Sequence, residues 1–169
     1  MVAGKLKAYK IKLTPVAEGT YRKFAESAAG PIQRGELGHA AVKRMRLIDE
    51  CLDMLIPHAP FSTDRALVGA LSNIFRVKKG RIRICYIASS AKFEITILYI
   101  SETLRKEGDR SDPYAIFGSM VTSGKFDEFF AALGVKTPKS SAGHIAFSPM
   151  DYSTTPLAMG CEFVFLWFA

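Results

Sequence analysis

The sequence predicts an α+β fold, in which an N-terminal strand and a two-helix hairpin pack on a three-stranded antiparallel meander. Short C-terminal helices and an irregular tail complete the predicted chain. The stretch 74–101, IFRVKKGRIRICYIASSAKFEITILYIS, has the alternation and the β-branched content of three strands joined by two tight turns. Upstream of it, apolar residues recur at the three- and four-residue spacing of amphipathic helices.

The first predicted elements are a short strand and a helix. Residues 9–13 alternate between apolar side chains and lysines, which is typical of a strand with one apolar and one basic face. Thr14-Pro15 then offers a hydroxyl N-cap followed by proline at the first helical position. We expect this helix to run to about Ala28 and to end at Gly30-Pro31.

A longer helix is expected from about Arg34 to Ile56, where Pro57 stops it. Residues 58–73 are then a connecting loop with at most a short turn. The helix is amphipathic because its apolar residues recur on one side. This stripe consists of Leu37, Ala41, Met45, Ile48, Leu52 and Leu55.

The first hairpin of the meander is strongly basic. If Lys79-Gly80 forms a two-residue loop, Lys78 pairs with Arg81 and Arg76 pairs with Arg83. Facing like charges repel, so this face is expected to meet a partner outside the fold, although the alternative is an ordinary solvated surface. The cationic face would carry Arg76, Lys78, Arg81 and Arg83. The apolar face would carry Phe75, Val77, Ile82 and Ile84.

The second hairpin is expected to turn at Ser89 to Lys92, so that Ala88 pairs with Phe93. Cys85 then falls on the basic face, where no neighbouring base marks it as a nucleophile, and we interpret it as structural. The core-facing residues of this hairpin would be Ile82, Ile84, Tyr86, Phe93, Ile95, Ile97 and Tyr99.

Two short helices are predicted after the meander. A polar, charged loop comes first, and Asp112-Pro113 can cap a helix from about Tyr114 to Thr122. A further helix is expected over residues 126–133, ended by Gly134. We therefore expect one domain over residues 1–136, and a poorly ordered extension over residues 137–169.

The composition favours an acidic partner and a cytoplasmic location. The net charge of +7 and the pI near 9.4 favour a polyanionic partner, which can be nucleic acid, an anionic membrane surface or an acidic protein segment. The three cysteines are widely spaced without a C-x-x-C pair, so we expect neither a disulfide framework, nor a metal site, nor another cofactor. The cationic N-terminus lacks the apolar run of a secretory signal, and no stretch approaches the ~20 apolar residues of a membrane helix.

The order of these elements resembles that of the RelE/ParE toxin superfamily. The residues from Leu67 to Arg105 carry the resemblance: leucines and a glycine, an aliphatic-aromatic-arginine strand, a glycine turn, an arginine strand and a β-branched strand. In this chain they are Leu67, Gly69, Leu71, Ile74-Phe75-Arg76, Gly80, Arg83-Ile84-Cys85-Tyr86 and Ile95 to Ile100.

The resemblance implies a small bacterial toxin of a type II pair, held inactive by an antitoxin encoded beside it. RelE-like members cut mRNA on the ribosome without a metal, whereas ParE-like members inhibit DNA gyrase. We predict a metal-independent endoribonuclease whose partners are its antitoxin and mRNA, on or off the ribosome. The alternatives are a gyrase inhibitor and an inactive member that only binds RNA or its antitoxin.

The resemblance also assigns site residues by position. Arg76 and Lys78 match the basic pair on one strand, and Arg83 matches the arginine of the next strand. Arg105 matches the arginine after the last strand, and Tyr114 matches the C-terminal tyrosine. In place of the usual short valine-glycine-His/Lys-Arg step, this chain has Ser-Glu-Thr-Leu-Arg before a long connection to the tyrosine.

Metal-free RNA cleavage needs a base for the 2′-hydroxyl, cations for the phosphate and an acid for the leaving oxygen. Arginine suits the phosphate because its planar fork donates two hydrogen bonds, and we expect Arg83 to fill this role. Further RNA contacts are expected from Lys10, Lys12, Lys79 and Arg81.

The base and the acid are not marked by any motif. The candidates for the base are Lys78 with a lowered pKa, Glu94 and Glu102, and Tyr114 could stack on a nucleobase. We expect neither His39 nor His58 to take part, since both lie on or beside helices, away from the basic face. His144 lies in the tail, where the sequence gives it no predicted position.

Overall fold

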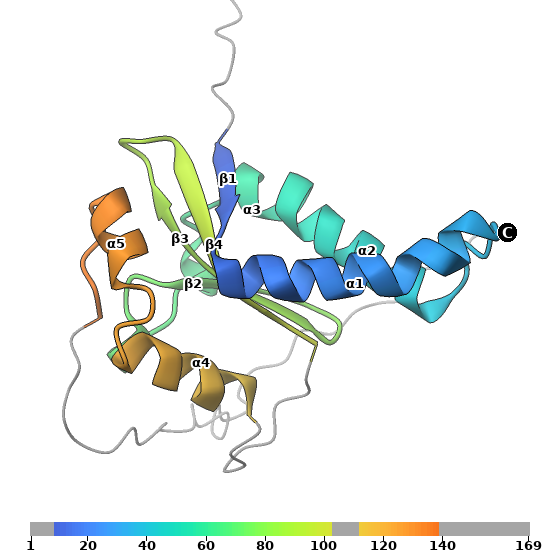
Figure 1. The fold of residues 1–169 in the computed structure, drawn as a ribbon. Helices are drawn as coiled ribbons and strands as arrows, with labels where there is room; N and C mark the ends of the chain where they lie inside the picture. The colour runs from blue at the N-terminus through green and yellow to red at the C-terminus, as the bar shows by residue number, and fades with distance from the viewer. Residues whose placement is uncertain (1–8, 103–111, 139–169) are drawn as a thin grey trace, which may run out of the picture.

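The computed structural model describes residues 9–102 and 112–138, in which four strands form one sheet with helices on both faces (Figure 1). The sheet order is β1-β4-β3-β2; β2, β3 and β4 form the predicted antiparallel meander, and β1 runs parallel to β4. The predicted α+β fold is confirmed, and the structure adds that the N-terminal strand joins the sheet beside β4. The strands are β1 (Lys10–Leu13), β2 (Phe75–Lys79), β3 (Ile82–Ser89) and β4 (Glu94–Ser101).

One face of the sheet is covered by the predicted helical hairpin, α1 (Pro15–Gln33) and α2 (Ala40–Glu50). A π-helical turn (Cys51–Leu55) and the short α3 (Ile56–His58) continue α2. Within the described residues, no helix is long and apolar enough to cross a bilayer. The buried core on this face includes Ala17, Ile48, Leu52, Ile56, Val77, Ile84, Tyr86 and Ile97.

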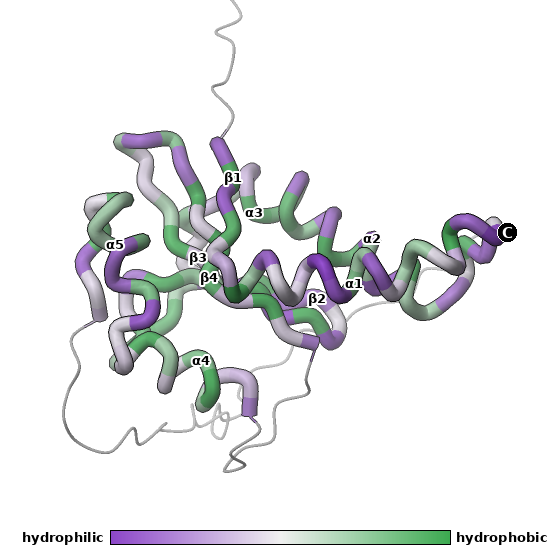
Figure 2. Tube along the Cα trace, viewed as in Figure 1, coloured by the Kyte–Doolittle hydropathy of each residue, from purple (hydrophilic) through white to green (hydrophobic). Residues whose placement is uncertain are grey.

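The other face is partly covered by α4 (Pro113–Thr122) and α5 (Asp127–Leu133). Both helices begin and end close to the predicted residues, and Figure 2 shows that α4 is hydrophobic along most of its length. This face was expected to be open and cationic, but from Cys85 onward it is apolar and buried, so the basic part is confined to the β2–β3 end. The second core includes Cys85, Ile87, Leu98, Phe117, Phe126 and Phe130.

The first helix is longer than predicted. Thr14 caps it as expected, but α1 passes through Gly30-Pro31 and ends at Gln33 instead of near Ala28. A residue before proline usually avoids the helical conformation because its Cβ meets the proline ring, and glycine has no Cβ. The chain therefore stays helical until the last turn.

The second helix begins later and ends later than predicted. His39 is the N-cap, with its Nδ1 accepting the Ala41 N–H at 3.2 Å, and Leu37 lies outside the apolar stripe with 51% of its surface exposed. The helix passes Pro57, whose ring would clash with the carbonyl four residues earlier in an ordinary α-helix. The π-helical turn relieves this clash, because the Ile56 N–H bonds five residues back to the Cys51 carbonyl.

The β2–β3 hairpin turns one residue later than predicted. Lys79 pairs with Ile82, so Gly80 and Arg81 form the loop, and Gly80 takes a left-handed φ of 55° at its first central position. The predicted register is wrong by two residues, but an even shift leaves every strand side chain on its predicted face. Arg76, Lys78 and Arg83 therefore share one face, while Arg81 lies in the turn.

The β3–β4 pair contains a bulge that the sequence does not reveal. Cys85 pairs with Tyr99 whereas Tyr86 pairs with Ile97, which leaves Leu98 as the extra residue. Tyr99 therefore packs on the side of α4 and not on the predicted core face with Tyr86.

The second turn is also displaced from its predicted register. Ser89 pairs with Glu94, and Phe93 lies in the turn with a φ of 51°. Ala88 pairs with Ile95 and not with Phe93 as predicted, and the Phe93 ring lies 5.6 Å from the ring of Tyr9.

Thr14 joins the start of α1 to the bulge. Its hydroxyl donates to the Leu98 carbonyl at 2.9 Å and accepts the Ala17 N–H at 3.3 Å. Its backbone N–H donates to the Ile97 carbonyl at 3.0 Å, and the residue is completely buried. One side chain thus connects the N-terminal segment to the middle of the sheet.

Candidate functional site

Arg76 on β2 and Tyr114 in the first turn of α4 come together, although 38 residues separate them in the chain. The Arg76 Nη1 donates to the Tyr114 hydroxyl at 3.2 Å, and its guanidinium carbon lies 5.5 Å from the centre of the ring. The carboxylate of Asp112 accepts the Tyr114 N–H at 2.9 Å and fixes the start of α4. The fold therefore holds the tyrosine against the arginine.

Lys78 and Arg83 lie on the same face as Arg76 but differ in exposure. Lys78 is exposed, whereas Arg83 is 6% exposed. The Arg83 Nη1 donates to the carbonyls of Gly80 and Ile82 at 2.8 and 3.2 Å. Arg83 was expected to face a phosphate, but its guanidinium is turned onto the hairpin loop, where the carbonyl oxygens satisfy it.

A cleft of about 270 Å³ opens at the outer edge of β2, the last strand of the sheet. The 3₁₀ turn Thr63–Arg65 crosses this edge, where Ala66 forms a bridge with Phe75. The cleft therefore lies between three elements: the 3₁₀ turn, the end of the π-helical turn at Leu55, and β2 from Arg76 to Lys78. Its lining consists of Leu55, Asp64, Arg65, Arg76, Val77 and Lys78.

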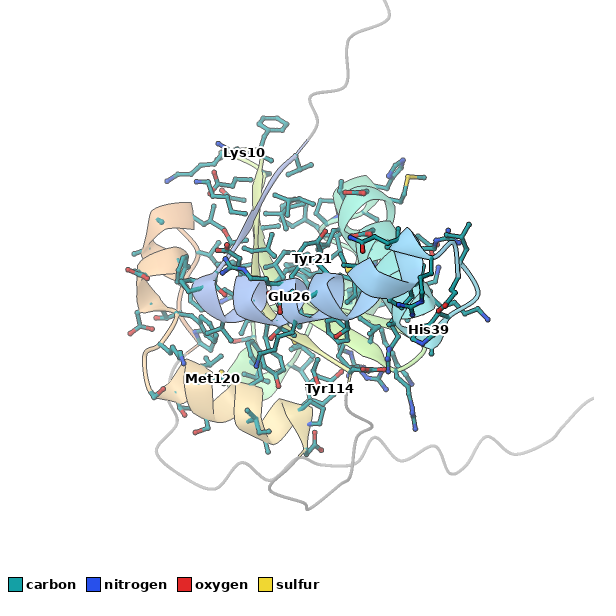
Figure 3. All side chains as sticks on the ribbon, turned by 45° about the vertical axis from the view of Figure 1, so that its right-hand side comes forward. Lys10, Tyr21, Glu26, His39, Tyr114 and Met120 are labelled. Atoms are coloured by element: carbon teal, nitrogen blue, oxygen red, sulfur yellow. The ribbon has the colours of Figure 1, made fainter. Side chains whose placement is uncertain are left out.

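The remaining predicted RNA contacts are spread over other surfaces. Lys79 faces the helical hairpin and forms an ion pair with Glu50. Lys10 and Lys12 lie on β1 at the opposite edge of the sheet, and Figure 3 shows Lys10 and Tyr114 at opposite ends of the molecule. The structure thus brings together Arg76, Lys78, Arg83 and Tyr114, but not these lysines.

The two acidic candidates for the general base have cationic partners elsewhere. Glu94 pairs with Lys12 at 2.7 Å, and Glu102 pairs with Arg44 at 2.9 Å. Neither lines the cleft.

The histidines that the structure describes have local partners. His39 caps α2, and the Nδ1 of His58 lies at hydrogen-bond distance, 2.7 Å, from the Met54 carbonyl. Two predicted positions, Arg105 and His144, fall outside the described residues.

Cys85 and Tyr86 have structural surroundings. Burial raises the pKa of the Cys85 thiol to about 12, so the thiol stays protonated and unreactive at neutral pH. The Tyr86 hydroxyl donates to the Pro60 carbonyl at 3.0 Å, and burial raises the pKa of this hydroxyl. Both residues occupy the structural roles expected of them.

Asp64 and Arg65 are cleft residues that sequence reasoning missed. They lie in the connection expected to be a loop, and no motif or periodicity marks them. Arg65 is held by the carbonyls of Leu55 and Ala59, to which its Nη1 donates at 2.7 and 3.1 Å. Among the residues that the structure describes, no three His, Cys, Asp or Glu side chains gather where they could hold a metal ion.

Comparison with known proteins identifies the family. A family model described as a toxin with endonuclease activity, of toxin–antitoxin systems, the YhaV toxins, matches residues 26–137, which is more than half of the chain. The toxin–antitoxin complex RelBE2 from Mycobacterium tuberculosis is similar at 15% identity and a TM-score of 0.43, over 56% of this chain and 98% of that chain. No curated protein sequence matches. The chain therefore belongs to the YhaV family of toxins with endonuclease activity, and the predicted role as the toxin of a toxin–antitoxin system is confirmed.

Proposed function

We propose that this protein is a metal-independent endoribonuclease that cleaves mRNA as the toxin of a type II pair. The observation that carries the proposal is the convergence of Arg76, Lys78 and Tyr114 at the β2 edge. The endonuclease activity described for the family favours cleavage over the inhibition of gyrase.

Arg76 and Lys78 supply positive charge where a scissile phosphate would lie. An arginine fork donates two hydrogen bonds to phosphate oxygens, and a lysine adds a compact charge and protons. Preorganised donors at developing charge typically lower a barrier by several kcal/mol. Tyr114 positions the Arg76 fork through its hydroxyl, since only 8% of its surface is exposed.

Arg83 acts, in this proposal, by positioning. Its hydrogen bonds to the Gly80 and Ile82 carbonyls hold the loop that ends β2, and its charge adds to the field around Lys78. Arg105, which lies outside the described residues, is proposed as a further phosphate contact on the strength of the family resemblance.

The partners follow from the same proposal. A cognate antitoxin would hold the toxin inactive, as the membership of the family in toxin–antitoxin systems suggests. The toxin would act in the cytoplasm, where mRNA is available both free and on ribosomes.

The test compares cleavage by the wild-type protein with cleavage by Arg76→Ala and Lys78→Ala. We expect primer extension after induction to show cut mRNA, and purified toxin to leave 2′,3′-cyclic phosphate and 5′-hydroxyl ends in the presence of EDTA. Each variant should cut more slowly by a factor of about 100 or more. Lys43→Ala removes one exposed cation from α2 and should cut normally.

Other results would overturn parts of the proposal. Intact mRNA together with loss of DNA supercoiling would identify a gyrase inhibitor, and loss of cleavage in EDTA would show a metal requirement. Arg83→Ala is a poorer test, because removing a buried, hydrogen-bonded guanidinium alters the hairpin as well as the charge.

A further inference from the structure

The β2-edge cleft contains one carboxylate among its cations. Of the described side chains that line it, Asp64 alone is acidic, while Arg65, Arg76 and Lys78 are basic. A carboxylate repels a phosphate and so weakens anion binding in this cleft. Its presence there must therefore serve something other than RNA affinity. Proton transfer is such a function, because cleavage requires a base close to the phosphate.

The position of Asp64 relative to Arg76 is fixed by the backbone. Asp64 lies in the 3₁₀ turn Thr63–Arg65, and the next residue, Ala66, forms a bridge with Phe75 on β2. The Leu67 N–H also donates to the Ile74 carbonyl at 2.8 Å. The turn is therefore attached to the strand that carries Arg76 and Lys78.

The carboxylate is oriented and ionised. The Ser62 hydroxyl donates to the Asp64 Oδ1, and this hydrogen bond is the main cause that holds the pKa of Asp64 below its ordinary value. At neutral pH the group is thus an acceptor, which is the form that a general base requires. The charged and polar groups around it are Ser62 and Arg65 on its own turn and Arg76 and Lys78 on β2.

We propose that Asp64 is the general base and Lys78 the general acid of the RNA cleavage described above, on which this inference rests. Asp64 takes the proton of the 2′-hydroxyl as the O2′–P bond forms. The P–O5′ bond breaks, and the Lys78 ammonium gives a proton to the leaving 5′-oxygen. The products are a 2′,3′-cyclic phosphate and a 5′-hydroxyl, and both side chains regain their protonation states by exchange with water.

The first experiment measures single-turnover cleavage of a defined RNA, presented free and on ribosomes. Asp64→Asn keeps the shape and the hydrogen bond to Ser62 but removes the basicity, and it should slow cleavage about 10²- to 10⁴-fold. Asp64→Glu should recover part of the rate. Glu26→Gln, on the exposed side of α1 (Figure 3), removes one carboxylate elsewhere and should cut normally.

The second experiment uses pH. The wild-type rate should fall on the acid side as Asp64 becomes protonated, and Asp64→Asn should lack this limb. Ser62→Ala keeps the carboxylate but removes the hydrogen bond that lowers its pKa, so the acid limb should move to higher pH. This variant tests the base even if Asp64→Asn fails to fold, which circular dichroism would show.

The third experiment separates the acid from the base. In an RNA with sulfur replacing the leaving 5′-oxygen, the leaving group departs without a proton. Cleavage of this substrate should be restored in Lys78→Ala and remain slow in Asp64→Asn.

The outcomes are distinguishable. A wild-type rate for Asp64→Asn, or an unmoved acid limb in Ser62→Ala, overturns the role of Asp64 while the nuclease stands. Failure of the sulfur substrate to restore Lys78→Ala overturns the role of Lys78. If the wild-type protein cuts no RNA in either presentation, the proposed function itself fails.

Discussion

Thr14 is completely buried, and its hydroxyl serves two segments of the chain at once. It caps α1 and also satisfies the Leu98 carbonyl at the bulge of β4. Loss of an N-cap costs ~1 kcal/mol, and an unsatisfied buried carbonyl costs ~1–3 kcal/mol.

We therefore expect Thr14→Val, which keeps the shape of the side chain, to lower the free energy of unfolding by ~2–3 kcal/mol. Thr14→Ser retains the hydroxyl and should cost less than half as much. Thr20→Val is the matched control, because the Thr20 hydroxyl only donates to the Val16 carbonyl within α1. Urea unfolding followed by circular dichroism measures all three, and equal losses for Thr14→Val and Thr20→Val would contradict this account.

Strand alternation predicts which face a side chain lies on, but it does not predict the conformation of that side chain. The placement of Arg76, Lys78 and Arg83 on one face was predicted correctly, because a strand has a period of two and the register error was even. Alternation does not say where a long side chain goes, and Arg83 turns back onto its own loop. Asp64 lies in a segment without periodicity, so only the folded chain shows that it lines the same cleft as Lys78.

At the scale of elements, α4 contributes side chains to the hydrophobic core and is packed firmly on the sheet. Phe117 is completely buried, and its ring lies 5.5 Å from the ring of Tyr99 and 5.8 Å from that of Phe126. The helix that carries Tyr114 is thereby packed onto the sheet.

Phe117→Ala should accordingly lower the free energy of unfolding by ~3–5 kcal/mol, because it leaves a cavity under α4. Met120→Ala, in the same helix but only partly buried (Figure 3), should cost less than half of this. Thermal and urea unfolding provide the comparison. Similar small losses for both variants would show that α4 is only loosely attached.

Helices whose ends are marked by capping residues in the local sequence were predicted well. Asp112-Pro113 and Gly134 delimit α4 and α5 as expected, because capping depends on neighbouring residues alone. The ends of α1 and α2 were predicted less well, because the chain stays helical through Gly30-Pro31 and past Pro57, which usually end a helix. The bulge at Leu98 depends on the pairing of β3 with β4, and no local pattern marks it.

At the scale of the whole molecule, positive charge is widely distributed, with a net charge of +7, but the cations differ in where they lie. Arg76 and Lys78 line the β2-edge cleft, whereas Lys10 and Lys12 lie on β1 across the sheet. The proposed site therefore predicts that position matters more than total charge.

The affinity for a 2′-O-methyl RNA, which cannot be cleaved, should fall with salt because phosphate contacts release counterions. Replacing Arg76 and Lys78 together by alanine should reduce the slope of log affinity against log salt by about 1.4, at ~0.7 per phosphate contact on a single strand. Replacing Lys10 and Lys12 together removes the same charge and should change the slope much less. Equal changes would mean that the overall charge binds RNA without a defined site.

The fold class was predictable because the spacing of apolar residues distinguishes helices from strands, and the turn residues between them give their order. The covering of the second face was not predicted, although the apolar residues of α4 and α5 needed a partner surface within a chain of this size. The cations of the β2–β3 hairpin lie at one end of this face, whereas Cys85, Ile87 and Leu98 belong to the core that α4 and α5 cover.

The parallel pairing of β1 with β4 has a consequence for synthesis of the protein on the ribosome. β1 emerges first, yet its partner strand spans Glu94–Ser101, and the Thr14 hydroxyl reaches its acceptor only when Leu98 has been made. Contacts between such distant parts of a chain form late, because a long loop must close before they are made. A nascent chain that stops before Tyr114 contains Arg76 without its partner. Until Tyr114 has been made, the chain lacks the contact that holds the Arg76 guanidinium in the proposed cleavage site.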